Sequence, residues 1–572
     1  MPRKVVVIGG VALGPKAACR LKRLEPDAQV TIVDRGEKIS YGGCGIPFYI
    51  SGEVSDAAEL QSTSFHMLRD PAFFRDTKDI EARNNTEAVR IDRAAKTVRV
   101  RDLVSGTEED LAYDQLVLAT GSSPRRLPIP GADLPGVHVV ADLDAAIAIR
   151  AGLTAGKVGS AVVIGAGFIG LEMAVALADM WGIETTVVEY ADQVLPTVLG
   201  PTLARMAQKH MEEKGVAFRL GAQVTAVQGE SGAERVVVKT ADGEETLDAE
   251  LVIMSVGVSP NSELAKAAGL EVSPRGAIVV DELLRTSDPD IYSGGDCVEL
   301  KNAVTGQPMF LPMGSLANRH GRLVGDNIAG LGRKADPVVG SWCVKLFDLA
   351  AAGTGLTLAA AKRAGLDAVC VHASQLDRAH FYPDKDFMYL ELVAERGTRR
   401  VLGVQGVSPM GDALVGRIGA VAAVLAQGPD VDVLSNLELP YSPPFTTAMD
   451  VLNMVANVAD NVLSGRNHSI TPEEFEALFA DRDSGRTFFL DCRELGNAAP
   501  FIEKYPGVWH HIPQGQLAAR LAEVPRDRKV VLLCNTGTRS YEALVTLRHA
   551  GYGDVANVYG GMVSLHAAGV EI

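Results

Sequence analysis

One local pattern occurs twice in the first half of the chain and restricts its fold more than any other feature. Each copy is a short Val/Ile run, a glycine-rich turn, an Ala/Leu-rich helix and a second run that ends in an acidic residue. The first copy starts with VVVIGGVALG and ends at Asp34, and the second starts with AVVIGAGFIG and ends at Glu189. This order predicts parallel sheets with nucleotide-binding turns. We therefore expect an α/β fold with two nucleotide-binding three-layer parallel-sheet domains.

The second glycine turn has the full dinucleotide pattern, with Gly165, Gly167 and Gly170 in its three glycine positions. The first glycine makes the tight turn, the second lets the backbone approach the pyrophosphate, and the third lets the helix pack on the strand. Glu189 follows nineteen residues after Gly170. A carboxylate there accepts hydrogen bonds from ribose hydroxyls and repels a 2′-phosphate. This turn predicts binding of NADH in preference to NADPH.

The first glycine turn is less regular, because Val11 occupies its middle glycine position. The glycines that remain are Gly9, Gly10 and Gly14. Asp34, twenty residues after Gly14, restores the pattern. A nucleotide turn this close to the N-terminus, followed by another, predicts FAD in the first domain.

Later segments support a flavin site. DIYSGGD is a strand followed by Gly295 and Asp296, which can place a carboxylate on the ribityl chain. The segments LVLATGSSP and LVIMSVGVSPN end two further strands. From these two segments we assign four more residues to cofactor binding: Ala119, Thr120, Gly121 and Gly257.

A glycine-rich loop with a single cysteine follows the first unit. The segment ISYGGCGIPFYISG places Cys44 between Gly43 and Gly45. A thiolate among glycine amides near a helix start has a lowered pKa and attacks disulfide sulfur. We therefore predict that Cys44 is redox-active. Five other cysteines fall inside helix or strand patterns, and we expect them to be buried: Cys19, Cys297, Cys343, Cys370 and Cys492.

These motifs resemble those of the flavin and pyridine-nucleotide disulfide oxidoreductases, and within them the single-cysteine coenzyme A disulfide reductases. The resemblance covers residues 1 to about 460. It implies that Cys44 lies against the flavin ring and alternates between a thiolate and a mixed disulfide. Two-cysteine members carry another cysteine five residues later, where this chain has Tyr49, so a two-cysteine mechanism is excluded.

The same resemblance implies substrate contacts and a homodimer. In these reductases two tyrosines of the partner subunit face the cysteine, and the motifs HFYP and YSPPF match them with Tyr382 and Tyr441. Each tyrosine is a candidate hydrogen-bond or proton donor to the leaving thiolate, or else a half-buried aromatic. Arg23 and Ser40 match coenzyme A contacts, and Arg20 belongs to the same basic run. A solvated basic face is the alternative for the arginines.

The C-terminal part contains a second cysteine loop. The segment KVVLLCNTGTRS ends a strand and turns into a helix, so its amides can form an anion nest around Cys534 that Arg539 closes. Together with LDCRE and YGGM, this loop resembles the active loop of single-domain rhodaneses, which implies that Cys534 carries a persulfide. Thr471 and Glu474 make a capping box that opens this domain.

The expected domain order follows from these motifs. An FAD-binding domain in two parts (1–150 and 256–334) surrounds an NADH-binding domain (151–255), and an α+β dimerisation domain (335–450), a linker (451–470) and an α/β rhodanese domain (471–572) follow. The connection to the last domain is expected to contain a helical stretch from Ala448 to Leu463. The net charge of −16 argues against nucleic acid or an anionic membrane as a partner. No apolar run approaches the ~18 residues of a membrane helix. Seven cysteines without a disulfide framework indicate a reducing cytoplasm.

The motifs together predict an NADH-dependent flavoprotein reductase of coenzyme A persulfide, polysulfide or coenzyme A disulfide. Cys44 carries the reduction, Cys534 relays sulfane sulfur, and sulfide is released. One alternative is an NADH oxidase or peroxidase with a sulfenic acid on Cys44, although the chain has no histidine before His66 to handle a peroxide. Another is a sulfur-transfer or redox-sensing protein with a slow flavin. No metal site is predicted.

Overall fold

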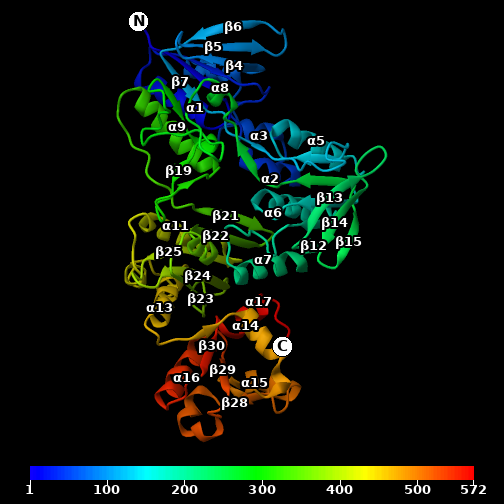
Figure 1. Ribbon diagram of the computed structural model, residues 1–572, viewed down its shortest axis with the longest axis vertical. Helices are drawn as coiled ribbons and strands as arrows, with labels where there is room; N and C mark the ends of the chain where they lie inside the picture. The colour runs from blue at the N-terminus through cyan, green and yellow to red at the C-terminus, as the bar shows by residue number, and fades with distance from the viewer. The chain divides into compact units, whose positions relative to one another are not determined.

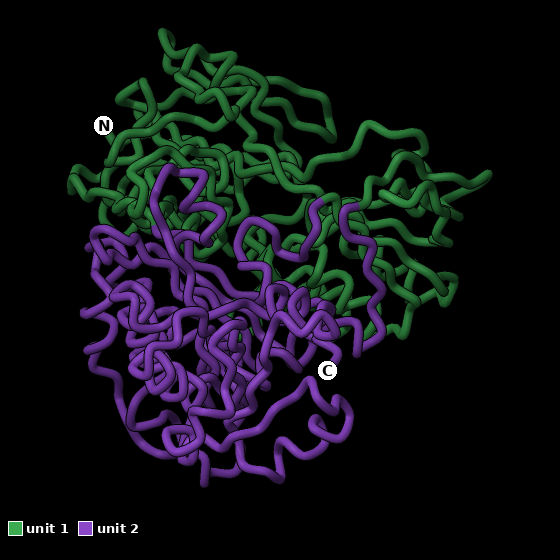
Figure 2. Tube along the Cα trace, turned by 60° about the horizontal axis from the view of Figure 1, so that its bottom comes forward, with its two compact units in different colours: residues 1–190, 222–338 green, residues 191–221, 339–572 purple.

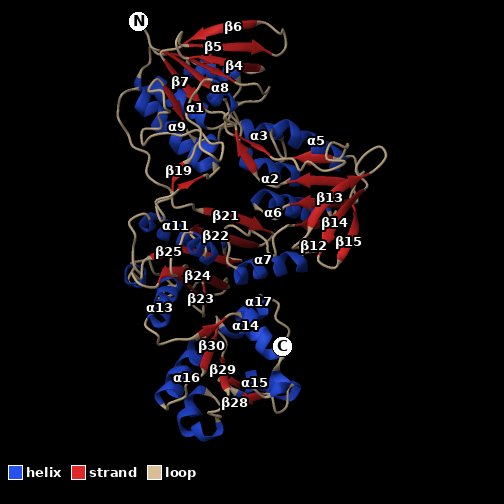
Figure 3. Cartoon of the chain, viewed as in Figure 1, coloured by secondary structure: helices blue, strands red, loops and turns tan.

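The computed structural model describes residues 1–572, which separate into two compact units. One unit contains residues 1–190 and 222–338, and the other contains residues 191–221 and 339–572 (Figure 2). Both units are mixtures of helices and sheets (Figure 3).

The first parallel sheet of the N-terminal unit contains the start of the chain. Its strand order is β18 (Ile291–Ser293), β7 (Gln115–Leu118), β1 (Lys4–Ile8), β2 (Gln29–Val33) and β3 (Glu81–Arg83). Its central strand, β1, is buried from Val5 to Ile8, as expected for a parallel sheet covered on both faces. Helices α1 (Leu13–Leu24) and α9 (Gly314–Ile328) contact each other beside it (Figure 1).

The second parallel sheet of this unit contains the other glycine turn. It includes β11 (Glu184–Val188), β10 (Ser160–Ile164), β16 (Leu251–Met254) and β9 (Val137–Val139), all parallel. Helix α6 (Phe168–Val175) follows β10 and continues into a π-helical turn (Ala176–Met180). The expected pair of nucleotide-binding sheets is confirmed. Two antiparallel three-stranded sheets complete the unit: β4 (Thr86–Asp92), β5 (Thr97–Asp102) and β6 (Glu108–Ala112), and β13 (Gln223–Gln228), β14 (Arg235–Thr240) and β15 (Gly243–Asp248).

The C-terminal unit begins with an antiparallel sheet. Its order is β21 (Trp342–Leu346), β22 (Leu349–Gly355), β25 (Val401–Ser408), β24 (Phe387–Glu395) and β23 (Ala368–Leu376). Every residue of β25 is buried, so elements cover both faces of the sheet. Helices α7 (Pro201–Glu213) and α11 (Gly411–Leu425) contact β22 and β25.

The connection expected over residues 451–470 is largely helical, as its sequence predicts. Residues Val451–Leu463 form helix α13, which contacts β23 and β24. Its hydrophobic face is buried through Leu452, Val455 and Ala459. A helix with such a face is stabilised by packing against a sheet, and it is therefore part of this fold rather than an open connection.

The C-terminal domain is a parallel sheet with the order β26 (Ser469–Ile470), β30 (Val555–Val558), β29 (Lys529–Leu533), β27 (Thr487–Asp491) and β28 (Trp509–His511). Helix α14 (Pro472–Ala480) opens it, and the expected capping box between Thr471 and Glu474 is present. Helix α16 (Thr538–His549) follows β29. This α/β domain confirms the expected fold.

All seven cysteines are free thiols. Cys297 and Cys492 are buried, and Cys19 and Cys370 are partly buried. The expectation of burial is wrong for Cys343, because alternate side chains of β21 point outward and this one is exposed. None of the helices is both long enough and apolar enough to cross a membrane.

Candidate functional site

The first glycine turn connects β1 to α1, and its glycines are required by close backbone approaches. Gly9 has φ +112°, and a Cβ there would meet the carbonyl oxygen of Ala119 at 2.1 Å. A Cβ at Gly14 would meet the carbonyl oxygen of Gly9 at 1.9 Å. The turn therefore brings α1 close to the ends of β1 and β7, which leaves its N-terminus open to a phosphate.

Two carboxylates flank this turn. Asp34 accepts hydrogen bonds from the N–H groups of Gly10 at 2.6 Å and Gly36 at 2.7 Å. Asp296 is held in a short 3-10 turn after β18, and its Oδ1 atom is buried without a hydrogen-bond partner. Burial raises the pKa of Asp296 to about 6. An orphaned buried oxygen of this kind fits a ligand hydroxyl, as the ribityl chain of FAD provides.

A buried histidine supports the Gly-Gly-Asp turn. The N–H of Gly295 donates to Nδ1 of His320 at 3.2 Å, and burial lowers the pKa of His320 to about 4. The ring is therefore neutral at neutral pH and accepts this bond. The sequence pattern contained no signal for this histidine, because it lies on α9, 25 residues after Gly295 along the chain.

The second glycine turn is equally crowded at its ends and open in its middle. Gly165 has φ +103°, and a Cβ at Gly170 would meet the carbonyl oxygen of Gly165 at 1.9 Å. A Cβ at Gly167 would meet nothing within 4 Å, which leaves the cradle that a pyrophosphate needs at the start of α6. Glu189 accepts from the N–H of Ala166 at 2.7 Å. These residues fit NADH.

Hydrogen bonds join the segment Ala119–Gly121 to a later part of the N-terminal unit. The hydroxyl of Thr120 donates to the carbonyl of Asn261 at 2.6 Å, and the amide of Asn261 donates back to the carbonyl of Thr120 at 2.8 Å. Gly121 and Gly257 adopt left-handed φ values of +65° and +95° next to the paired strands β8 (Ser122–Pro124) and β17 (Val258–Pro260). Three residues predicted to bind cofactor, Thr120, Gly121 and Gly257, thus lie where these two segments meet.

Cys44 lies in a 3-10 turn (Gly43–Gly45) that leads directly into α2 (Ile46–Ser51), as predicted. The residue is exposed. A Cβ at Gly314, the first residue of α9, would lie 3.3 Å from its Sγ atom, so this glycine leaves space around the sulfur.

The predicted lowering of the Cys44 pKa is wrong. Desolvation of the sulfur and the negative charges of Glu172 and Asp296 raise the pKa of Cys44. The N–H groups of Gly314 and Cys44 lower it, but they do not balance these effects. Burial, with the negative charge of two carboxyl groups from distant parts of the chain, therefore outweighs these two N–H groups.

Glu172 is a site residue that sequence reasoning missed. It is the only acidic residue of helix α6, FIGLEMAV, and burial raises its pKa to about 7. An acid inside an otherwise apolar helix was the available signal. Because its pKa lies near neutrality, its charge beside Cys44 changes over the physiological range.

The residues predicted to contact coenzyme A have different surroundings. Arg20 forms an ion pair with Asp326 of α9, so its charge is already balanced, contrary to the expectation of a cation open to phosphates. Arg23 on the last turn of α1 is exposed. Ser40 is buried with φ +54°, and its N–H donates to the carbonyl of Gly10 at 2.7 Å. Arg23 is thus the more accessible of the two arginines.

The two tyrosine motifs are neighbours in the C-terminal unit. Tyr382 is half-buried and Tyr441 is 54% exposed. The N–H of Ala379 donates to the carbonyl of Pro443 at 3.3 Å and joins the two loops. The structure therefore joins two loops whose tyrosines lie 59 positions apart along the chain.

The second cysteine loop connects β29 to α16. Cys534 is 1% exposed, and the N–H of Gly537 donates to its Sγ at 3.1 Å. Ser540 places its hydroxyl 3.2 Å from the same sulfur, a contact that the sequence did not suggest. Arg539 lies in the first turn of α16 and pairs with Glu494 at 3.7 Å. The inward amide of the predicted nest is present at Gly537.

Known families match three consecutive parts of the chain. Residues 3–315 match the pyridine nucleotide-disulphide oxidoreductases, residues 342–452 match the dimerisation domain of the same family, and residues 471–568 match the rhodanese-like domain. The fold and the site define a flavin- and pyridine-nucleotide-dependent oxidoreductase. The chain belongs to the pyridine nucleotide-disulphide oxidoreductase family and carries a C-terminal rhodanese-like domain.

Individual relatives extend this comparison. A solved NAD-dependent persulfide reductase from A. fulgidus is 39% identical, with a TM-score of 0.92 over 98% of this chain and 99% of its own. The NAD(P)H coenzyme A polysulfide/persulfide reductase of Pyrococcus horikoshii is 34% identical over 80% of this chain and 98% of its own. The NADH oxidase of Methanocaldococcus jannaschii is 33% identical over 81% of this chain and 100% of its own.

Proposed function

We propose that this protein is an NADH-dependent reductase of coenzyme A persulfide, polysulfide or coenzyme A disulfide. The observation that carries the proposal is the exposed Cys44 at the start of α2, without a second cysteine in its loop, in a chain that also has the Cys534 loop. A single exchangeable cysteine suits a substrate that itself supplies the second sulfur. The similarity to the persulfide reductase from A. fulgidus along almost the whole chain supports this substrate class.

The cofactors are assigned to the two glycine turns. The first turn, Asp34 and Asp296 would hold FAD, and the second turn with Glu189 would hold NADH. The bound flavin supplies the two-electron link between NADH and a sulfur on Cys44. Gly9, Gly14, Gly165 and Gly170 permit the close helix approaches on which both sites depend.

The thiolate of Cys44 attacks the carbon-bound sulfur of coenzyme A persulfide. The S–S bond of the persulfide breaks, a Cys44–S–S–coenzyme A mixed disulfide forms, and hydrosulfide leaves and takes up a proton. Two electrons from NADH and one proton then return the mixed disulfide to the Cys44 thiolate and free coenzyme A. The sum is one NADH and one proton consumed for each sulfide released.

Tyr382 and Tyr441 are proposed to assist this exchange from the partner subunit. A phenol group donates a hydrogen bond or proton to the leaving thiolate. The loops that carry them expose an apolar set that a homodimer interface would cover: Phe381, Tyr441, Phe445 and Met449, at 68%, 54%, 70% and 55%. Arg23 and Ser40 are the proposed coenzyme A contacts. We propose the cytoplasm as the location.

The rhodanese domain is proposed to load the substrate. A sulfane sulfur on Cys534 passes to the thiolate of coenzyme A, which produces coenzyme A persulfide and restores the Cys534 thiolate. The Gly537 N–H and the Ser540 hydroxyl stabilise negative charge on sulfur during this transfer. A fused sulfur carrier favours persulfide over a symmetric disulfide as the main substrate.

A second candidate is an NADH oxidase that forms a sulfenic acid on Cys44. The name of the Methanocaldococcus jannaschii relative favours it. A substrate panel under NADH separates the two: oxygen, hydrogen peroxide, coenzyme A disulfide and coenzyme A persulfide. Faster turnover with oxygen than with the sulfur substrates supports the oxidase.

Variants of the two cysteines test the main proposal. Cys44→Ser is expected to abolish NADH-dependent sulfide release while NADH still bleaches the flavin. Cys534→Ala is expected to slow only substrates that load through the rhodanese domain. Sulfide release at the normal rate from the Cys44→Ser variant contradicts the proposal.

A further inference from the structure

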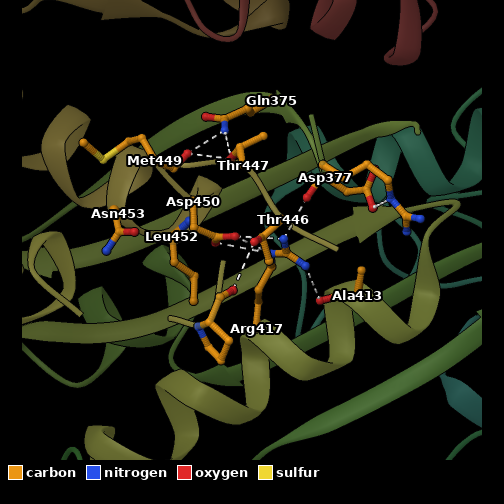
Figure 4. Close-up of polar contacts among 12 residues, drawn as sticks. Gln375, Asp377, Ala413, Arg417, Thr446, Thr447, Met449, Asp450, Leu452 and Asn453 are labelled. Atoms are coloured by element: carbon orange, nitrogen blue, oxygen red, sulfur yellow. Dashed lines mark hydrogen bonds and ion pairs between the residues drawn. The ribbon is translucent and has the colours of Figure 1, made fainter. Parts of the chain in front are cut away.

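A buried arginine connects the two loops that carry Tyr382 and Tyr441. Arg417 on α11 is 7% exposed, and all three of its nitrogen atoms donate hydrogen bonds. Nη1 donates to the carbonyl of Ala413 at 3.0 Å within the helix. The remaining donors leave the helix and reach Asp377 and Asp450 (Figure 4).

The first of these contacts lies at the base of the Tyr382 loop. Nη2 of Arg417 donates to the carbonyl oxygen of Asp377 at 2.8 Å. Asp377 is fully buried and closes the loop, because its N–H donates to the carbonyl of Asp386 at 2.9 Å. Its carboxylate accepts from Arg378 at 2.7 Å. The guanidinium group of Arg417 therefore contacts the residue at which this loop leaves β23.

The second contact lies at the end of the Tyr441 loop. Nε and Nη2 of Arg417 donate to the carboxylate of Asp450 at 3.1 and 2.8 Å, and Asp450 is 3% exposed. Asp450 also caps α13 by accepting from the N–H of Leu452 at 3.0 Å. One carboxylate thus ends the loop, starts the helix and pairs with Arg417.

Further hydrogen bonds join the two tyrosine loops directly. Besides the Ala379 to Pro443 bond, the amide of Gln375 on β23 donates to the hydroxyl of Thr447 at 2.6 Å and to the carbonyl of Met449 at 2.8 Å (Figure 4). Gln375 and Asp377 flank the start of one loop, and Thr447 and Asp450 flank the end of the other. Arg417, on α11, donates hydrogen bonds to both loops.

We propose that Arg417 is a positioning residue, which holds Tyr382 and Tyr441 in the single arrangement needed to protonate the leaving thiolate. This inference rests on the proposed role of the two tyrosines. A planar guanidinium fixes both partners at once, because its donors point in set directions within one plane. A lysine ammonium at the end of a flexible stem cannot reproduce that geometry.

The test uses two disulfides with the same coenzyme A half and different leaving thiols. Coenzyme A disulfide releases a weakly acidic thiol, and the mixed disulfide of coenzyme A with nitrothiobenzoate releases a strongly acidic one. In the exchange at Cys44 only the release of coenzyme A needs a proton donor, since a thiol of low pKa leaves without help. The later reduction releases coenzyme A from either substrate, so the exchange is followed alone, as release of the first thiol by enzyme with a free Cys44 thiolate and without NADH. Arg417→Gln is expected to slow this release from coenzyme A disulfide by about tenfold or more and to leave the half-saturating concentration within about twofold.

The same variant is expected to release nitrothiobenzoate from the mixed disulfide at nearly the normal rate. Arg417→Lys should recover only part of the loss. Arg399→Gln is the matched control, because Arg399 also bridges two acidic residues of this fold, Asp432 and Asp460 at 2.8 and 2.9 Å. Arg399→Gln should change the rates with the two disulfides equally. If Arg417→Gln does not fold, Asp450→Asn removes the charge of the pair and keeps a helix-capping side chain.

Tyr441→Phe and Tyr382→Phe separate failure of this inference from failure of the proposed function. Arg417→Gln added to the double variant Tyr382→Phe/Tyr441→Phe is expected to slow it no further, because both donors are already absent. An equal loss on both disulfides from Arg417→Gln overturns the positioning role. The positioning role is also overturned if Arg417→Gln leaves the rates with both disulfides unchanged while Tyr441→Phe slows only the reaction of coenzyme A disulfide. If neither tyrosine variant discriminates, the proposed tyrosine chemistry fails first.

Discussion

The hydroxyl oxygen of Ser540 lies 3.2 Å from the Sγ atom of Cys534. It also lies 2.6 Å from Oδ1 of Asn557 and 3.2 Å from the carbonyl oxygen of Gly537, so the sulfur is one of three acceptors for its proton. A hydrogen bond to a charged sulfur contributes about 1.5–3 kcal/mol. Removing this hydroxyl should therefore slow chemistry in which Cys534 carries negative charge.

We predict that Ser540→Ala lowers sulfur transfer from a sulfane donor to coenzyme A by about tenfold or more. The measurement is the rate of coenzyme A persulfide formation. Reduction of preformed coenzyme A persulfide by NADH is the internal control and should not change. An unaltered transfer rate contradicts a role for this hydroxyl at the sulfur.

Glu172→Gln is expected to make Cys44 more acidic. The pKa of Glu172 is about 7, so above this pH its negative charge opposes ionisation of Cys44. The glutamine variant lacks that charge, and its thiolate should form at a lower pH. The pH dependence of alkylation by iodoacetamide should shift toward acid, with a few-fold faster reaction near neutrality. The exposed Glu263→Gln variant should keep the normal profile, and an unshifted Glu172→Gln profile contradicts the electrostatic contact.

Glu391→Gln is expected to flatten the decline of stability with rising pH. Glu391 on β24 is 4% exposed, and burial raises its pKa from 4.5 to about 8. Between these values the unfolded chain loses this proton and the folded chain keeps it. The free energy of unfolding therefore falls as pH rises through that range, by at most about 1.4 kcal/mol per pH unit.

Thermal melts of the wild type and of Glu391→Gln across that pH range measure the effect. The difference in Tm between the two proteins should change in favour of the variant as the pH approaches 8. Close packing makes this site sensitive, because a Cβ at Gly200 would lie 2.0 Å from Oε2 of Glu391. Parallel pH profiles for the two proteins show that Glu391 ionises in the folded state.

Glu189→Gln is expected to change cofactor preference. Gln keeps an acceptor for the N–H of Ala166, which Glu189 engages at 2.7 Å, and removes the charge that repels a 2′-phosphate. The ratio of kcat/KM for NADPH to that for NADH should rise by about tenfold. A ratio equal to that of the wild type shows that a group other than Glu189 discriminates between NADH and NADPH.

Much of the fold could be predicted because its signals are local. Gly165, Gly167 and Gly170 with Glu189 specify a strand, a turn and a helix within one short segment, and the structure contains them. The capping box at Thr471 is equally local. Helix α13 was expected as a connection, but its packing was not predicted, because its apolar face contacts β23 and β24, which lie far from it along the chain.

By itself, the sequence determined the two nucleotide-binding units, the single cysteine of the first loop and the rhodanese-like loop, since glycine, cysteine and acid at fixed spacing act on their own neighbours. Only the tertiary structure decided the electrostatics of the site. The pKa of Cys44 is raised by burial and by the charges of Glu172 and Asp296, and both tyrosine loops contact Arg417. Coulombic effects and buried hydrogen bonds depend on distance in space, which spacing along the chain does not specify.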